Sequence, residues 1–291
     1  MNVRQCPRTA RFYETTERGL QCLLCPRGCV IPFDRTGVCG ARRNAAGRLI
    51  AESYGQISSL ALDPIEKKPL RHFYPGGMIL SIGSYGCNLR CPFCQNYSIS
   101  MGQPPVEFIP PEKIVRQAEE LIPQGNIGVA FTYNEPFIAW EFMYDTAKLA
   151  HERGLVNVIV TNGYVSPEPL MELLPFIDAM NIDVKGFSDE FYAELGGTLA
   201  PVMATVEAAA RHCHVELTTL ILPDSASGPR NAYASVIEPL ARWVAGIDEE
   251  IPLHLTRFYP RWQMSSTPPT DMDVIRALGR TAEKYLRHVH Y

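Results

Sequence analysis

The sequence has no long apolar run and no excess of one charge. No stretch approaches the roughly 18 to 20 apolar residues that span a bilayer. The segment Met1–Tyr13 carries three arginines but no apolar core of a signal peptide, which argues against secretion. A net charge of −4 over 291 residues gives no basic footprint for nucleic acid. We therefore expect a cytoplasmic protein with no membrane segment and no nucleic-acid partner.

The sequence also lacks internal repeats, low-complexity tracts and the His-Glu-x-x-His motif of zinc hydrolases. With 46% hydrophobic and 20% charged residues, it has the composition of an ordinary globular protein. The sequence does contain nine cysteines, and seven of them fall into two tight groups. In a reducing compartment, grouped cysteines indicate metal or cluster ligands rather than disulfides.

The sequence divides into two regions that differ in composition and pattern. Residues 1–76 hold the first cysteine group and end in a Pro-Gly-Gly link, which predicts a small Cys-rich N-terminal module. Residues 77–291 alternate between strand-like and helix-like segments. The predicted strands are Met78–Tyr85, Gly128–Tyr133, Asn157–Thr161, Ala179–Val184, Val215–Leu222 and Pro252–Phe258. The predicted helices are Pro111–Leu121, Pro136–Glu152, Pro167–Leu174, Pro201–His212, Asn231–Ala245 and Asp271–His288.

Six successive β–α units with apolar strands predict an α/β fold whose parallel sheet is buried on both faces. Six units are too few to close an eight-stranded barrel. We therefore expect a partial (β/α)6 barrel, with a doubly wound open sheet as the alternative. In either fold, the chemistry gathers at the carboxyl ends of the strands.

A cysteine motif follows the first predicted strand. Cys87, Cys91 and Cys94 have the spacing C-x3-C-x2-C. Three thiolates on one loop can bind three corners of a 4Fe–4S cube, and the fourth iron is left for a small bidentate ligand such as the amino and carboxylate groups of methionine. A zinc knuckle with a fourth ligand elsewhere is the alternative. Phe93 is placed to contact an adenine ring, although an aromatic residue also suits core packing.

With these residues the sequence resembles the radical S-adenosylmethionine (SAM) superfamily, whose signature is C-x3-C-x-(aromatic)-C. More narrowly, it resembles the radical SAM proteins of the AmmeMemoRadiSam system, relatives of the glycyl-radical-enzyme activases. The resemblance runs from about Gln21 to Gln263. Its further marks are Cys22-Leu23-Leu24-Cys25-Pro26, Asp63-Pro64-Ile65-Glu66-Lys67-Lys68-Pro69-Leu70, Cys91-Pro92-Phe93-Cys94-Gln95-Asn96 and Thr132-Tyr133-Asn134-Glu135-Pro136.

The resemblance implies SAM-binding roles for residues after the second strand. The superfamily has a Gly-Gly-Glu-Pro-like segment there, which holds the amino group of SAM. Tyr133, Asn134 and Glu135 stand at the matching positions, so both glycines are replaced. The alternative for Glu135 is an acidic residue that favours a helix N-terminus.

Polar residues also end the later strands. In the activases, segments like those around Asn162, Asp183 and Lys185 contact the ribose and carboxylate of SAM, which implies cofactor-binding or catalytic roles here. Asp183 and Lys185 share one face of their strand, so a purely structural ion pair is the alternative. His254, on the last predicted strand, is either a catalytic residue or a satisfied core histidine.

The N-terminal group consists of Cys22, Cys25, Cys29 and Cys39. Four thiols suit tetrahedral zinc, which we favour slightly, or a second 4Fe–4S cluster, and unligated thiols are the remaining alternative. A small Cys-rich module with little apolar content needs a metal to fold.

The sequence therefore predicts a radical SAM oxidoreductase or modifying enzyme. It would cleave SAM reductively at a 4Fe–4S cluster, and the 5′-deoxyadenosyl radical would take hydrogen from an unidentified substrate. An electron donor of the flavodoxin or ferredoxin type is expected, and the narrower resemblance implies partners of the Memo and AMMECR families. A glycyl radical enzyme activase is one alternative. A non-catalytic iron–sulfur or zinc scaffold within a multiprotein assembly is the other.

Overall fold

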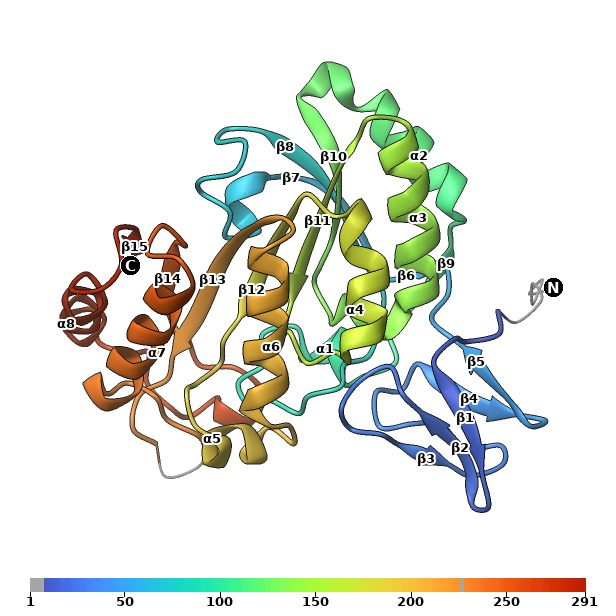
Figure 1. The fold of residues 1–291 in the computed structure, drawn as a ribbon, viewed down its shortest axis with the longest axis horizontal. Coiled ribbons are helices and arrows are strands. Elements are labelled where there is room, and N and C mark those ends of the chain that lie inside the picture. Colours follow the sequence, from blue (N-terminus) through green and yellow to red (C-terminus); the bar gives the residue numbers. More distant parts are fainter. Residues whose placement is uncertain (1–7, 226–227) are drawn as a thin grey trace.

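The computed structural model describes residues 8–225 and 228–291. Its main feature is a sheet of eight strands in the order β15-β14-β13-β12-β11-β10-β8-β7 (Figure 1). Neighbouring strands from β8 to β15 are parallel, and β7 is antiparallel to β8. The bounds are β7 (Ser59–Pro64), β8 (Met78–Gly83), β10 (Asn126–Phe131), β11 (Val156–Thr161), β12 (Ala179–Asp183), β13 (His214–Ile221), β14 (Leu253–Arg257) and β15 (Val289–His290).

The strand order decides between the two predicted architectures. From β8 to β14 each strand lies beside the previous strand of the parallel series, always on the same side. A doubly wound sheet would reverse direction at a switch point. Among the described residues, the two outer strands do not pair with each other, so the barrel stays open. The predicted partial (β/α)6 barrel is confirmed.

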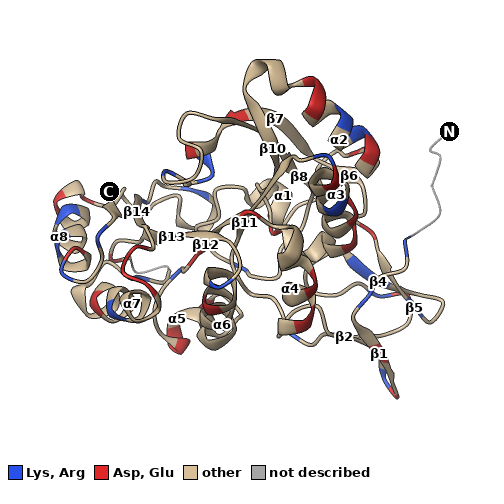
Figure 2. Cartoon of the chain, turned by 45° about the horizontal axis from the view of Figure 1, so that its top comes forward, with Lys and Arg blue, Asp and Glu red and all other residues tan. Residues whose placement is uncertain are grey.

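Helices cover the outer face of the sheet, and α3, α4 and α6 run side by side along it (Figure 1). In α8 the buried residues Ile275, Leu278, Gly279 and Ala282 recur at helical spacing, so one face packs on the sheet. Helices α2, α7 and α8 each carry both acidic and basic residues (Figure 2). The helices are α1 (Tyr97–Ser100), α2 (Pro111–Glu120), α3 (Trp140–Glu152), α4 (Pro167–Leu173), α5 (Asp189–Glu194), α6 (Leu199–Ala210), α7 (Ala234–Ile247) and α8 (Met272–Ala282).

Short 3-10 turns supplement these helices, at Ile65–Lys67, Ile122–Gln124, Pro136–Ala139, Leu174–Phe176 and Trp262–Met264. The predicted helix over 136–152 therefore begins as a 3-10 turn, because Glu135 caps the backbone N–H of Phe137 and Pro136 follows the cap. None of the helices in the described ranges has the length and apolar character needed to cross a membrane.

The N-terminal region forms small antiparallel sheets that pack on the main domain. Strands β1 (Tyr13–Thr16), β2 (Gly19–Cys22) and β3 (Val30–Ile31) form one, β4 (Arg42–Ala45) and β5 (Arg48–Ala51) a second, and β6 (Gln56–Ile57) with β9 (Glu107–Phe108) a third. A buried ion pair joins this region to α3, with Arg42 Nη2 2.8 Å from Glu141 Oε2.

Strand β7 precedes the predicted boundary at residue 76 and yet belongs to the large sheet. Its sequence ends in Asp63-Pro64, and proline is tolerated there because β7 is an edge strand. The division at residue 76 stays a prediction.

Candidate functional site

A cavity of about 560 Å³ lies at the carboxyl ends of the parallel strands. Its wall comes from the ends of β10 to β14, from the loop after β8 and from the segment after β7. Pockets for small ligands and cofactors typically have roughly 300 to 1,000 Å³. The cavity therefore lies where this fold gathers its chemistry, and it is large enough for a nucleoside ligand.

Cys87, Cys91 and Cys94 all line this cavity, and none of them forms a disulfide. Burial raises the pKa of the Cys91 thiol to about 12, and burial also raises the pKa of Cys87. Thiols in such a place stay protonated unless a bound cation stabilises the thiolates. The three residues thus fit a metal cluster that supplies positive charge.

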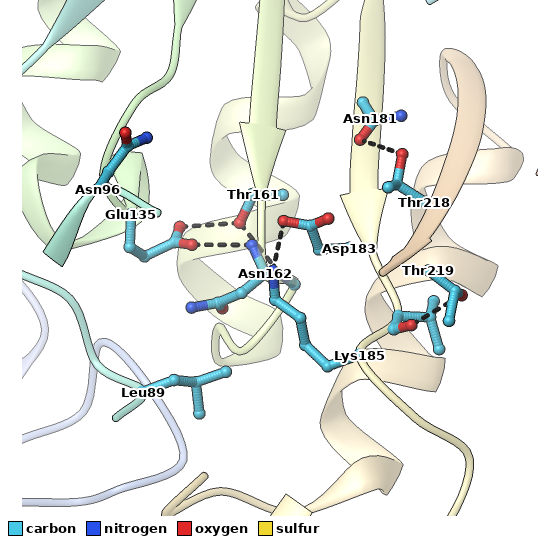
Figure 3. Close-up of polar contacts among 12 residues, drawn as sticks. Leu89, Asn96, Glu135, Thr161, Asn162, Asn181, Asp183, Lys185, Thr218 and Thr219 are labelled. Atoms are coloured by element: carbon cyan, nitrogen blue, oxygen red, sulfur yellow. Dashed lines mark hydrogen bonds and ion pairs between the residues drawn. The ribbon is translucent and has the colours of Figure 1, made fainter. Parts of the chain in front are cut away.

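Glu135 reaches the same cavity and is almost fully buried, with 3% of its surface exposed. Its Oε1 accepts hydrogen bonds from Thr161 Oγ1 at 2.8 Å and from the Phe137 N–H at 3.0 Å. Its Oε2 accepts from the Asn162 N–H at 2.8 Å (Figure 3). Burial raises the pKa of Glu135 to about 7, although these donors oppose the shift. A buried carboxylate of this kind is stabilised by a cationic partner such as an ammonium group.

Asn162 is held by its neighbours in one orientation. Its Nδ2 donates to Asn88 Oδ1 at 2.9 Å and lies 3.6 Å from Cys87 Sγ, while its Oδ1 accepts from the Tyr164 N–H at 2.8 Å. Asn88 in turn donates to the Tyr164 carbonyl at 2.7 Å. Sequence reasoning missed Asn88, whose only signal is its position directly after the first cysteine of the motif.

The predicted pair of Asp183 and Lys185 forms at the end of β12. Lys185 Nζ lies 2.6 Å from Asp183 Oδ2, and both side chains line the cavity (Figure 3). Burial lowers the pKa of Lys185, but the charges of Asp183 and Cys91 outweigh it and the pKa is raised overall. Lys185 therefore stays cationic near the cysteines.

A second charged network in the cavity joins the predicted cofactor residue Tyr133 to Asp63 and Lys68, which were not predicted as site residues. Lys68 Nζ lies 2.9 Å from Asp63 Oδ2, and the Tyr133 hydroxyl donates to the same oxygen at 2.6 Å. Lys68 is buried and lies 4.8 Å from the centre of the Tyr133 ring. Tyr133 has a φ of 71°, a conformation that costs a non-glycine residue about 1 kcal/mol or more. The Asp63 bond and the Lys68 contact help to hold it there.

The two other predicted cofactor residues also line the cavity. Phe93 is buried. Asn134 uses its side-chain amide to hold the cluster loop, since Oδ1 accepts from the Ser84 N–H at 2.9 Å and Nδ2 donates to the Gly86 carbonyl at 3.1 Å.

The predicted catalytic residue His254 does not itself line the cavity. Its Nε2 lies 2.6 Å from Glu216 Oε2 in the interior. Glu216 also contacts His214 at 3.0 Å and accepts from the backbone N–H groups of Arg71 and His72. The network lies directly below the cavity, because His254 pairs in the sheet with Thr218 and Glu216 pairs with Asn181, and both partners line the cavity. These contacts favour the satisfied core histidine of the alternative interpretation, and the catalytic role stays a prediction.

The N-terminal cysteines lie apart from the cavity. Cys22, Cys25, Cys29 and Cys39 together line a small space of about 20 Å³, and none forms a disulfide. The structure therefore keeps the two cysteine groups separate, one on a large cavity and one around a small space.

Comparison with known proteins gives a consistent result. A family model for the radical SAM superfamily matches residues 81–226. The uncharacterized protein MJ0808 of Methanocaldococcus jannaschii is 40% identical over 97% of this chain and 84% of its own length. The pyruvate formate-lyase-activating enzyme of Clostridium pasteurianum is 30% identical over 38% of this chain and 48% of its own length.

A solved structure shares the fold. SuiB of Streptococcus suis, bound to S-adenosylmethionine, has a TM-score of 0.53 at 14% identity, over 71% of this chain and 47% of that chain. The chain belongs to the radical SAM superfamily, whose members use a 4Fe–4S cluster and SAM.

Proposed function

We propose that this chain binds a 4Fe–4S cluster through Cys87, Cys91 and Cys94 and cleaves SAM reductively beside it. The observation that carries the proposal is that these cysteines share one cavity of about 560 Å³ with Glu135 and Lys185. When bound, the reduced cluster supplies the electron that breaks the C5′–S bond of SAM, which yields methionine and a 5′-deoxyadenosyl radical.

The residues of the chain bind and orient SAM in this proposal. Glu135 accepts hydrogen bonds from the ammonium group of the methionine part, and this charge-assisted contact stabilises the buried carboxylate. Lys185 faces the methionine carboxylate, and Asp183 faces the ribose hydroxyls. Asn162 is held beside Cys87 by Asn88 and supports the same end of the cavity.

The substrate reaches the radical from the open side of the barrel. The cavity extends to Lys67, just after β7, and to Thr256 and Arg257 of β14, so it is bounded by residues from both margins of the open barrel. In this proposal the remaining walls keep water from the radical, which protects it from side reactions. The site takes hydrogen from a substrate carbon, and a one-electron donor of the flavodoxin or ferredoxin type supplies the reducing equivalent.

Activation of a glycyl radical enzyme is a second candidate. It is favoured by the relatives named as activating enzymes, which include a putative glycyl-radical enzyme activating enzyme of Methanocaldococcus jannaschii at 29% identity over 40% of this chain. In that case the substrate is a glycine Cα in a partner protein. Partners of the Memo and AMMECR families stay a prediction from the sequence resemblance.

The test is anaerobic incubation of cluster-loaded protein with SAM and dithionite, followed by chromatographic measurement of 5′-deoxyadenosine. The proposal predicts product from the wild type and none from Cys91→Ala. Protein that holds its cluster and SAM but yields no 5′-deoxyadenosine, with or without candidate substrates, would contradict the proposal and favour a non-catalytic scaffold.

A further inference from the structure

The four N-terminal cysteines surround one small space although they come from separate segments. Cys22 ends β2, Cys25 and Cys29 lie in the loop before β3, and Cys39 precedes β4. All four line the space of about 20 Å³, which has room for about one water-sized atom. Four sulfurs on one small space match the ligand number of a closed metal site.

Backbone N–H groups donate to three of these sulfurs. The N–H of Leu24 donates to Cys22, the N–H of Arg27 donates to Cys25, and those of Ala41 and Arg42 donate to Cys39. The donors Leu24, Arg27 and Ala41 lie two residues after their cysteines, and Arg42 lies three residues after Cys39. A neutral thiol is a weak acceptor, whereas a thiolate accepts strongly. These donors would stabilise thiolates more than neutral thiols once a metal is bound.

A buried arginine faces the same space. Arg42 is fully buried, and its Nη atoms bind Glu141 Oε2 and the Arg11 carbonyl. Its Nε has no hydrogen-bond partner, and the side chain lines the space between the cysteines. Four thiolates around a divalent ion or a 4Fe–4S core carry a net charge of about −2. An unpartnered N–H of a buried guanidinium beside them offsets part of that charge.

We propose that Cys22, Cys25, Cys29 and Cys39 bind a second metal centre as four thiolates, and that this centre positions the loop of the SAM cluster. Zinc and a 4Fe–4S cluster share this ligand chemistry, but a space of about 20 Å³ favours the single zinc ion, because a cluster of eight atoms would require the loops to move apart. Across the described ranges, no three His, Cys, Asp or Glu side chains already stand in the arrangement of a metal-ion site, and this holds for the motif cysteines too. The thiols therefore adjust their rotamers when the metal binds.

The module contacts the cluster loop directly. A Cβ on Gly86 would lie 2.3 Å from the Cys39 carbonyl oxygen, so only glycine fits at this approach. Arg27 Nε donates to the Asn88 carbonyl at 2.5 Å, and the Arg90 guanidinium donates to the Val38 carbonyl. Loss of the centre would therefore disturb the residues on either side of Cys87.

Metal analysis of a full-length variant that lacks the first cluster tests the binding half of the proposal. In the triple variant Cys87→Ala, Cys91→Ala, Cys94→Ala, we expect either about one zinc or about four irons per chain to remain, with a first shell of four sulfurs by X-ray absorption. These two results distinguish zinc from a second cluster. A metal-free triple variant, or a shell that contains nitrogen or oxygen, would overturn the proposal. This readout does not depend on SAM cleavage.

The positioning half is tested by Cys39→Ser, with Cys213→Ser as the matched control, because Cys213 lines neither site. We expect Cys39→Ser to lose the second metal and to change the EPR spectrum of the reduced SAM cluster or lower its occupancy, while the control keeps both. If Cys39→Ser does not fold, the milder Arg27→Gln removes one contact with the loop, and the same spectral change is expected. A cluster spectrum unchanged by loss of the second metal, or by Arg27→Gln, would overturn the positioning role.

Discussion

The two cysteine groups differ in ligand number and in the space before them. Cys87, Cys91 and Cys94 face a cavity of about 560 Å³, whereas the four N-terminal cysteines surround a space of about 20 Å³. Three ligands with free space suit a centre that binds a further molecule, and four ligands without free space suit a saturated centre. Cysteine thus suits a reactive or a supporting centre, and the difference lies in the number of thiols and in the free space beside them.

The difference extends to the groups around each set. The open cavity contains titratable residues, including Glu135 with a pKa raised to about 7. The small space between the N-terminal cysteines is bordered instead by arginines and backbone N–H groups that do not change charge near neutral pH. The first environment can respond to a ligand, and the second maintains a fixed charge.

The largest expected effect comes from a substitution among the three motif cysteines that face the large cavity. Cys87→Ala removes one of only three ligands, so 5′-deoxyadenosine formation should fall to the level of a protein-free control. Cys213→Ala, which alters a cysteine of neither group, should keep wild-type product. Substantial 5′-deoxyadenosine from Cys87→Ala would contradict the role of Cys87 as a ligand of the cluster that cleaves SAM.

The next largest effect concerns the buried ion pair between Arg42 and Glu141, which attaches the N-terminal region to α3. Arg42→Met leaves Glu141 buried without its charged partner, which should lower the free energy of unfolding by about 3–5 kcal/mol. Chemical denaturation measures this value. Arg276→Met removes an exposed pair with Asp273 and should change stability by less than about 1 kcal/mol. If both variants lowered the free energy of unfolding equally, the buried pair would contribute no more to stability than the exposed pair.

A smaller effect is expected from Glu135→Gln, which keeps the shape but removes the charge. A hydrogen bond to a charged group is worth about 1.5–3 kcal/mol, so the Kd for SAM should rise about 10- to 100-fold. Equilibrium dialysis with cluster-loaded protein measures it, with a substitution of the exposed Glu120, Glu120→Gln, as control.

The same residue predicts a pH dependence. Because the pKa of Glu135 is raised to about 7, the carboxyl is protonated below that pH and loses its attraction for an ammonium group. SAM affinity should therefore fall as pH drops from 8 to 6 in the wild type and stay flatter in Glu135→Gln. If SAM affinity varied with pH in the same way in the wild type and in Glu135→Gln, Glu135 would not be the partner of the SAM amino group.

The smallest expected effect is on catalysis by His254→Gln. His254 bonds to Glu216 below the cavity, so its loss should cost about 1–3 kcal/mol of stability and leave 5′-deoxyadenosine formation within about twofold. Lost cleavage in a variant of wild-type stability would restore the catalytic interpretation.

Much of the fold and one side of the site could be predicted from local patterns. Apolar runs located six of the seven parallel strands and missed only the two-residue β15. The rule that chemistry gathers at carboxyl strand ends brought Glu135, Asn162 and Asp183 to one cavity. His254 shows the limit of such patterns. Alternation indicates which face of a strand a residue occupies but not its position along the strand. The step of two residues from His254 to Thr256, which lines the cavity, corresponds to about 6.6 Å.

Contacts between distant segments were beyond the sequence patterns. Lys68 looks like a solvated charge in a linker, and only the pairing of β7 with β8 brings Asp63 to Tyr133. Asn88 gains its role from Asn162 and Tyr164, more than 70 positions away. Such residues depend on register and packing, which local periodicity does not contain.

The most direct test of the central claim is an electron–nuclear double resonance spectrum of the reduced, cluster-loaded protein with isotopically labelled SAM. If the three motif cysteines leave one iron open, the labelled amino nitrogen and carboxylate oxygen of SAM should both couple to the cluster. A cluster that shows no coupling to SAM, in protein that binds SAM by dialysis, would contradict the account.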